Sequence, residues 1–324
     1  MFTFAPLIRR NREIMQIHRD FDDLGNIRKP VVTTGSFDGV HVGHKTILNR
    51  LRKIADDIGG ETALITFHPH PRKVLYPDTV GKSLKLISTQ REKVELLKQT
   101  GLDHLIIIPF TLEFSRITSH DFVEKILVEK LHAQRIIVGF NHHFGHNRQG
   151  DFDYLYELAK NHDFEVEEIP EQDVENETVS STTIRKALHE GRIQRANAYL
   201  DHFYILMGPL QDGYPRCREA GFPTYSVGIE EQEKLVPPQG VYAISLIYGS
   251  LKYKGMLNIK QFEERADVRV EVHLFDHDHE AELRGQVVTL QFHKRMREEL
   301  NLNNTESFHK QLEQDKADIE QLIY

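Results

Sequence analysis

Hydrophobic positions in the first half of the chain alternate between short continuous runs and runs with helical spacing. The continuous runs predict buried strands at residues 30–34, 62–67, 105–108, 135–138 and 164–169. The helical runs predict helices at residues 47–58, 90–100 and 152–160, and another that starts near Thr118, where Thr118 and Asp121 have capping-box spacing. Strands that alternate with helices are typical of a parallel sheet, which binds ligands at the carboxyl ends of its strands.

The pattern changes after about residue 200. Strands with little helix between them are predicted at residues 203–210, 241–248, 251–259, 268–275 and 287–292. Within 268–275, apolar and polar residues alternate, so one face of that strand is apolar and the other polar. This half therefore resembles a small antiparallel barrel or sandwich, and the helical spacing of the last segment predicts a C-terminal helix that covers one side.

These patterns predict four regions. Residues 1–14 form a loose extension, 15–186 a Rossmann-like α/β domain with a parallel sheet, 187–202 a helical linker, and 203–324 a small antiparallel β-barrel with its helix. The length of 324 residues supports more than one domain, because a single hydrophobic core rarely serves so long a chain.

Composition narrows the class of protein. The most apolar stretch, residues 104–110, is too short to cross a bilayer, so we expect no membrane span. The net charge of −8 argues against a general binder of nucleic acid. Cys217 is the only cysteine, which excludes an intrachain disulfide and favours a cytoplasmic location. With 19 histidines in the chain, a histidine carries weight only within a pattern.

One such pattern follows the first predicted strand and reads Gly35-Ser-Phe-Asp-Gly-Val-His-Val-Gly-His44. Its glycines, Gly35, Gly39 and Gly43, let the backbone approach a ligand closely, and a helix start offers N–H groups to an anion. His41 and His44 are three residues apart and can converge on one bound group, which suits a polyphosphate during phosphoryl or nucleotidyl transfer. The alternatives are a turn with two surface histidines or a pair of histidines that bind zinc, although a catalytic zinc ion normally has a third protein ligand.

A second pattern, Val179-Ser-Ser-Thr-Thr-Ile-Arg185, stands just before a predicted helix. Its hydroxyl groups can cap the helix or bind phosphate oxygens, and Arg185 can present a forked cation to the same group. Alone, this pattern is equally consistent with a simple helix cap.

Together, the two patterns resemble the signature pair of nucleotidyltransferases. The full histidine turn, followed by Thr66-Phe-His-Pro-His-Pro71 and Val138-Gly-Phe-Asn-His-His-Phe-Gly145, resembles the prokaryotic bifunctional riboflavin kinase/FAD synthetase family. The resemblance runs from about Val31 to the C-terminus and is most specific in the first domain.

The resemblance implies that the first domain transfers AMP from ATP to FMN, and it assigns roles by motif. His41, His44 and Arg185 would be catalytic. The residues implied to bind ATP are Gly35, Ser36, Phe37, Asp38, Gly39, Gly43, Ser181 and Thr182. Flavin would be bound by Asn141, which could also bind magnesium, by Phe144, and by His70, for which a structural role fits equally well.

In the second domain, the resemblance implies phosphorylation of riboflavin by ATP. Glu271 lies where the family has its general base, although a solvent-facing strand position is the alternative. Thr224 and Ser226 would bind Mg²⁺.

Three departures from the family pattern lie in this domain. Tyr225 and Ser226 replace Ala and Asn, which we expect to place a bulky ring beside the metal. Cys217 replaces a glycine, and the run that starts at Lys260 replaces a Gly-x-x-Pro-Thr-Phe element.

Other hypotheses stay open from the sequence. The barrel could be a flavin-binding or assembly module without kinase activity, or the first domain could be another adenylyl- or cytidylyltransferase. A tRNA synthetase fits less well, because its lysine-rich second signature is absent. The expected partners are flavins and ATP, with no nucleic acid and no membrane; the oligomeric state, including a homo-oligomer, stays open.

Overall fold

The computed structural model describes residues 14–140, 142–174, 177–213, 221–262, 267–275, 283–300 and 305–323. The chain forms two compact units. The first comprises the described residues up to Leu84 together with Val94–Gln172, and the second comprises Lys85–Lys93 and the described residues from Asp173 onward. The boundaries expected for the functional domains, at residues 186 and 203, stay a prediction, and Asn141 and Cys217 lie outside the described residues.

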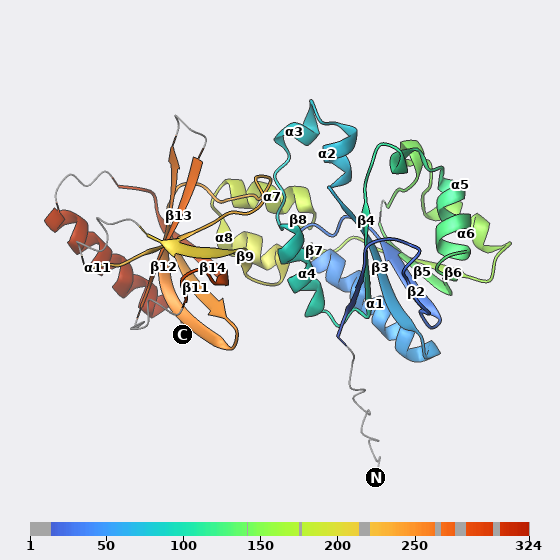
Figure 1. Cartoon of the computed structure of the whole chain (residues 1–324), viewed down its shortest axis with the longest axis horizontal. Helices are drawn as coiled ribbons and strands as arrows, with labels where there is room; N and C mark the ends of the chain where they lie inside the picture. The colour runs from blue at the N-terminus through green and yellow to red at the C-terminus, as the bar shows by residue number, and fades with distance from the viewer. Residues whose placement is uncertain are drawn as a thin grey trace, which may run out of the picture. The chain divides into compact units, whose positions relative to one another are not determined.

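The first unit contains a six-stranded parallel sheet, shown in Figure 1. Its strands are β1 (Gln16–His18), β2 (Pro30–Thr34), β3 (Glu61–His68), β4 (His104–Pro109), β5 (Arg135–Gly139) and β6 (Glu165–Ile169). Their order across the sheet is β1-β4-β3-β2-β5-β6. The predicted parallel sheet is therefore confirmed, and the buried apolar runs account for it, because all five residues of β2 are buried.

The strand order fixes where a ligand can bind. From β2 the chain proceeds to β3 and β4 on one side, and β5 and β6 then lie on the other side of β2. β2 and β5 are therefore the neighbours at which the direction of winding reverses. In sheets of this kind the crevice outside the carboxyl ends of such a pair is the usual binding site.

Helices connect the strands of this sheet. They are α1 (Val42–Ile58), α2 (Pro71–Leu75), α3 (Val80–Ser83), α4 (Gln90–Lys98), α5 (Ser119–Asp121) and α6 (Phe152–Ala159), together with the π-helix η2 (Phe122–Val128) and the 3₁₀ turns η1 (Phe114–Arg116) and η3 (His146–Arg148). Two predicted helix ends are confirmed. Gly59 ends α1 in the left-handed conformation with φ of 66°, and Thr118 caps α5 by accepting a hydrogen bond from the N–H of Asp121.

The second unit begins with the short strand pair β7 (Asp173–Val174) and β8 (Glu177–Thr178), followed by α7 (Ser181–His189) and α8 (Ile193–Leu200). Six strands then form a closed barrel: β9 (Tyr204–Asp212), β10 (Tyr225–Val227), β11 (Gly240–Tyr248), β12 (Leu251–Phe262), β13 (Asp267–Leu274) and β14 (Val287–Arg297). The barrel closes in the order β10-β13-β12-β11-β14-β9, with antiparallel pairing throughout. This confirms the predicted antiparallel barrel, although the sequence pattern did not reveal the three-residue β10.

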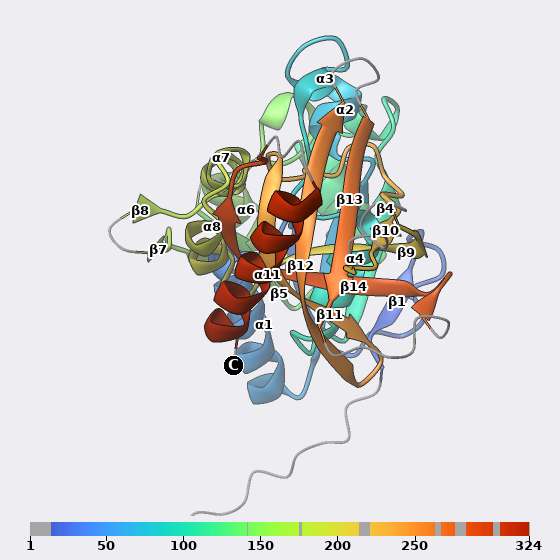
Figure 2. The same cartoon turned by 90° about the vertical axis from the view of Figure 1, so that its left-hand side faces the viewer.

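The last helix, α11 (Thr305–Leu322), lies against the outside of the barrel (Figure 2). Ile319 and Ile323 pack with Met256 and Phe275 in a buried apolar cluster. A buried ion pair adds to this contact, because Asp315 on α11 lies 2.6 Å from the guanidinium of Arg297 on β14. The predicted C-terminal helix is therefore confirmed.

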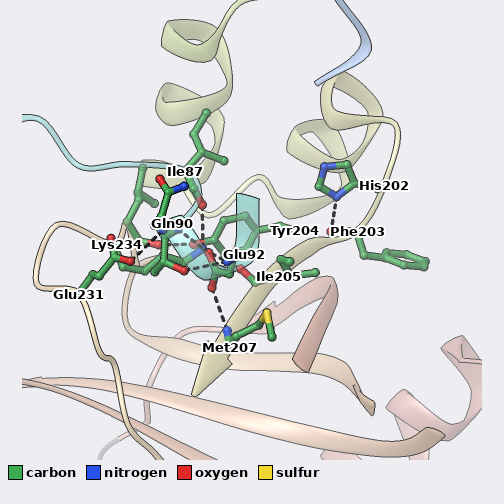
Figure 3. A network of polar contacts seen from close by, with 12 residues as sticks. Ile87, Gln90, Glu92, His202, Phe203, Tyr204, Ile205, Met207, Glu231 and Lys234 are labelled. Carbon is green, nitrogen blue, oxygen red and sulfur yellow. Dashed lines mark hydrogen bonds and ion pairs between the residues drawn. The ribbon is translucent and has the colours of Figure 1, made fainter. Parts of the chain in front are cut away.

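The segment Lys85–Lys93 belongs to the second unit by its contacts. Leu86 pairs with Lys234, and its N–H donates to the Glu233 carbonyl at 2.7 Å. Figure 3 shows the centre of this contact, where the fully buried Lys234 ammonium lies 2.5 Å from the Glu92 carboxylate. The same ammonium donates to the carbonyls of Ile87 and Ile205, so its charge is fully compensated in the interior.

None of the helices in the described part of the chain combines the length and the apolar content that crossing a bilayer requires.

Candidate active sites

The histidine turn joins the carboxyl end of β2 to the start of α1, beside β5 at the reversal point of the sheet. Three of its residues have positive φ: Phe37 at 47°, Gly39 at 85° and Val40 at 43°. Such a tight left-handed path is easy for glycine and strained for phenylalanine and valine, which is common where a backbone is shaped around a ligand. The predicted location of this motif, between a strand and a helix, is confirmed.

The two histidines lie against each other at the start of α1. The ring centroids of His41 and His44 are 3.6 Å apart and nearly parallel, and the Phe37 ring stacks on the other side of His44 at 4.4 Å. Gly43 permits this arrangement, since a Cβ atom there would lie 3.3 Å from the His41 ring. The sequence therefore brings both imidazoles together, as the spacing predicted.

The surroundings of this pair suit an anion. His41 is the N-cap of α1, and its side chain does not cap the helix. The N–H groups of a first helical turn have no acceptor within the helix, and the helix dipole adds positive potential at that end. The first turn of α1 carries no acidic residue. Phosphate oxygens are therefore the ligand type that this end of the helix would stabilise.

The second signature lies at the start of α7, in the second unit. Ser180 is the N-cap, and its hydroxyl accepts a hydrogen bond from the N–H of Thr183. Ser181 and Thr182 follow in the first turn, with Thr182 exposed. Arg185 is held by a hydrogen bond from its Nε to the Lys85 carbonyl at 2.8 Å. The residue that caps α7 is therefore Ser180, which precedes the two hydroxyl residues predicted to bind ATP.

Two of the residues predicted to bind flavin have structural contacts. The His70 ring is the N-cap of α2 and accepts a hydrogen bond from the N–H of Arg72, in agreement with the structural alternative. Phe144 is buried among Phe122 and Tyr154 and is 9% exposed. Asn141, two residues after β5, lies outside the described residues. The flavin-binding roles of all three stay predictions.

Next to Asn141, His142 is half-buried, and its Nε2 atom is shielded from solvent. Burial, together with the neighbouring His143 and Arg148, lowers the pKa of His142 to about 4. Its imidazole is therefore neutral at physiological pH, and its ring stacks near Phe144 with centroids 6.0 Å apart.

The barrel brings its three predicted residues together. Glu271 on β13 accepts a hydrogen bond from the Thr224 hydroxyl at 2.8 Å, and Ser226 on β10 is the strand partner of Glu271. Glu271 is only 8% exposed, so it does not lie on a solvated strand face. A buried carboxylate beside a hydroxyl group is an arrangement suited to general base catalysis.

One expectation about this site was wrong. Tyr225 was expected to place its ring beside the metal-binding residues. Successive side chains of a strand point to opposite faces, so Tyr225, paired with Val272, faces away from Ser226 and Glu271. The Tyr225 side chain is buried, and on the strand it faces the side opposite to Ser226.

The other two departures from the family pattern are the run that starts at Lys260 and the replacement of a glycine by Cys217. Lys260 forms an ion pair with Glu299 at 2.8 Å, and Cys217 lies outside the described residues. Sequence reasoning gave no role to Asn258, which pairs with Glu271 from β12. The sequence does contain a feature that could have singled out this residue, because Asn258 is the one polar residue in the apolar run Met256–Ile259.

Comparison with known proteins agrees with both halves of the chain. The family model for FAD synthetase matches residues 25–183, and the one for riboflavin kinase matches residues 200–323. A bifunctional riboflavin kinase/FMN adenylyltransferase of Listeria monocytogenes is 32% identical over 302 residues, covering 92% of this chain and 93% of that protein. A protein of the same name from Bacillus subtilis is 32% identical and covers 90% of this chain and 91% of its own.

A solved structure shares the fold. The crystal structure titled macrolide-efflux protein from Streptococcus pneumoniae superposes with a TM-score of 0.83 at 25% identity, covering 94% of this chain and 98% of that one. Its title describes that protein, whereas the matches along the sequence concern flavin enzymes. By its family models and its full-length relatives, the chain belongs to the bifunctional riboflavin kinase/FMN adenylyltransferase family.

Proposed function

We propose that this protein makes FAD in two ATP-dependent steps. The barrel phosphorylates riboflavin to FMN, and the α/β half transfers AMP from ATP to FMN with release of pyrophosphate. Relatives that match this chain over most of their length are named for both activities, which supports assigning both reactions to this protein. The observation that carries the adenylyl transfer is the stacking of His41 on His44, at 3.6 Å, at the start of α1.

In the adenylyl transfer, a phosphate oxygen of FMN attacks the α-phosphorus of ATP, and the bond from that phosphorus to the β-bridging oxygen breaks. Negative charge grows on the phosphates as pyrophosphate leaves. Imidazoles at a helix start can donate hydrogen bonds to these oxygens, and no covalent intermediate is needed. His41 and His44 are proposed to perform this role, and Ser181, Thr182 and Arg185 are proposed to bind the triphosphate.

In the kinase reaction, the terminal hydroxyl of the ribityl chain attacks the γ-phosphorus of ATP and ADP leaves. Glu271 is proposed to take the hydroxyl proton, because its buried carboxylate lies in contact with Thr224. Since the Thr224–Glu271 contact is present and Tyr225 faces away, the geometry favours an active kinase over a barrel without catalysis.

A magnesium ion fits the residues present in the barrel. Mg²⁺ prefers oxygen ligands, and the hydroxyls of Thr224 and Ser226 adjoin the Glu271 carboxylate. These two hydroxyls are proposed to hold the ion, which when bound would neutralise charge on the ATP phosphates. We also propose a reducing compartment such as the cytoplasm, because the whole sequence has a single cysteine.

Product analysis tests this proposal. The purified full-length protein is supplied with ATP and MgCl₂, and riboflavin or FMN is offered in separate tubes. Chromatography is expected to show FMN and then FAD from riboflavin, and FAD with pyrophosphate from FMN. Absence of FAD in the FMN tube would refute the adenylyl transfer, and absence of FMN in the riboflavin tube would refute the kinase.

A further inference from the structure

Strand pairing places a third polar residue next to Glu271. Asn258 on β12 is the strand partner of Glu271 on β13, and Ser226 on β10 is its partner on the other side. Directly paired residues of neighbouring antiparallel strands point to the same face of the sheet. Ser226, Glu271 and Asn258 therefore form a single row across three strands of the barrel.

The side-chain oxygen of Asn258 differs from the neighbouring Glu271 carboxylate of this row in its hydrogen bonding. It is buried, and among the residues that the structure describes it accepts no hydrogen bond. Glu271, by contrast, is engaged by the hydroxyl of Thr224. Buried polar atoms are nearly always paired, so an unpaired carbonyl oxygen beside a general base indicates a donor that comes from a bound molecule.

The residues on either side of this row suggest how that molecule lies. Two positions along the same face, Arg269 pairs with Lys260, which places two cations next to Glu271. The Arg269 guanidinium is 4.0 Å from the Glu271 carboxylate. Two positions in the other direction, Met256 pairs with His273 at the edge of a buried apolar cluster. The row thus separates a cationic zone suited to phosphates from an apolar zone.

A magnesium ion is a poorer match for the Asn258 oxygen than a substrate hydroxyl. Strands two apart in a sheet are separated by about 9.6 Å, and Mg²⁺ binds its ligands at about 2.1 Å. An ion held by Ser226 on β10 would therefore lie on the far side of Glu271 from Asn258. A hydroxylated chain lying along the row can instead reach Glu271 and Asn258 together.

We propose that Asn258 positions the acceptor substrate of the kinase. Its side-chain oxygen accepts a hydrogen bond from a hydroxyl of the ribityl chain of riboflavin, which holds the terminal hydroxyl against Glu271. This proposal rests on the kinase function proposed above. It adds a residue that recognises the ribityl chain and not the flavin ring.

The test compares riboflavin with lumiflavin, which has the same ring system without the ribityl chain. Asn258→Leu in the full-length protein is nearly isosteric and removes the acceptor. The KM for riboflavin is expected to rise about tenfold. The KM for ATP and the inhibition constant of lumiflavin in the same kinase assay are expected to stay unchanged. Lys252→Leu, at an exposed position of the same strand, is the matched control.

Several outcomes would overturn the proposal. They are an unchanged KM for riboflavin, an equal weakening of riboflavin and lumiflavin, and a loss of Mn²⁺ affinity measured by electron paramagnetic resonance with ADP present. The last result would make Asn258 a metal ligand. If the leucine variant does not fold, Asn258→Ser is measured in the same assays with the same expected direction. Lack of riboflavin phosphorylation by the wild-type protein would refute the kinase function itself, which keeps the two failures distinct.

Discussion

His44 lies between two other rings, with Phe37 on one side and His41 on the other. Because this stack presents two nitrogen-bearing rings at a helix start, we expect His44→Ala to lower the rate of FAD formation from FMN about 10²–10³-fold, as loss of a donor to a developing charge does in other enzymes. Initial rates with saturating ATP measure the effect.

Two controls separate chemistry from folding for this variant. Riboflavin phosphorylation by the same protein is expected to stay at the wild-type rate, because it depends on the barrel. His120→Ala, at a histidine whose side chain is 63% exposed, is expected to change neither reaction. FAD formation by His44→Ala at the wild-type rate would contradict the assignment of the phosphate site.

Glu271 offers the reciprocal experiment in the barrel. Glu271→Gln preserves the size of the side chain and removes its basicity, so riboflavin phosphorylation is expected to fall about 10²–10⁴-fold. FAD synthesis from supplied FMN is expected to continue unchanged. Glu298→Gln, at a carboxylate whose side chain is 83% exposed, is the matched control. Undiminished phosphorylation by Glu271→Gln would show that another group takes the proton.

At the scale of elements, β14 carries a histidine that ties stability to pH. Burial lowers the pKa of His293 to about 4, and its Nε2 pairs with the Ser245 hydroxyl at 2.8 Å. In the unfolded chain this histidine has an ordinary pKa near 6.5. Between pH 6.5 and 4 the unfolded state therefore binds more protons than the folded state, and stability is lost as the pH falls.

The corresponding variant is His293→Gln. The wild-type free energy of unfolding is expected to fall by up to about 1.4 kcal/mol per pH unit from this group alone as the pH drops from 6.5. Urea unfolding of the variant at pH 7, 6 and 5, followed by circular dichroism, is expected to show a shallower loss. The same slope in both proteins would mean that His293 does not contribute.

Periodicity predicted the elements whose pattern is local. The run Pro30–Thr34 is a strand within its predicted limits. The strand Tyr225–Val227 was missed because three residues give no period. The π-helix Phe122–Val128 was predicted only as a helix, because apolar spacing does not reveal the backbone hydrogen-bond pattern.

The residues of the candidate sites also differ in whether a local sequence pattern could predict them. His41 and His44 could be predicted because one short turn carries both. The Thr224–Glu271 contact depends on strand pairing between residues 47 positions apart, for which only the family resemblance gave a signal. Asn258 received no role because its register against Glu271 is set by the closed barrel and not by its neighbours in sequence.

At the scale of the whole molecule, no pattern in the sequence predicted that Lys85–Lys93 belongs to the second unit. Glu92 and Lys234 are 142 residues apart, and in the sequence each has the character of a surface charge. In the fold, Glu92 also accepts hydrogen bonds from the N–H groups of Thr89 and Met207. This one carboxylate therefore joins the start of α4 to strand β9 of the barrel.

We expect Lys234→Met to destabilise the second unit by about 3–5 kcal/mol, because it leaves the Glu92 carboxylate buried without its cation. Kinase activity followed across a urea series measures the loss. The double variant Glu92→Gln with Lys234→Met removes the buried charge and is expected to recover part of it. Lys310→Met, at a lysine whose side chain is 72% exposed, is the control. A single variant as stable as the wild type would contradict this account.

The central claim is that one chain carries out both phosphorus reactions on flavin, one at the γ-phosphorus and one at the α-phosphorus of ATP. The most direct measurement supplies the purified protein with riboflavin, MgCl₂ and ATP labelled distinguishably at these two positions, and then analyses the FAD formed. The account predicts FAD with one phosphate derived from each position. FAD without the γ-derived phosphate, or FMN with no FAD, would contradict it.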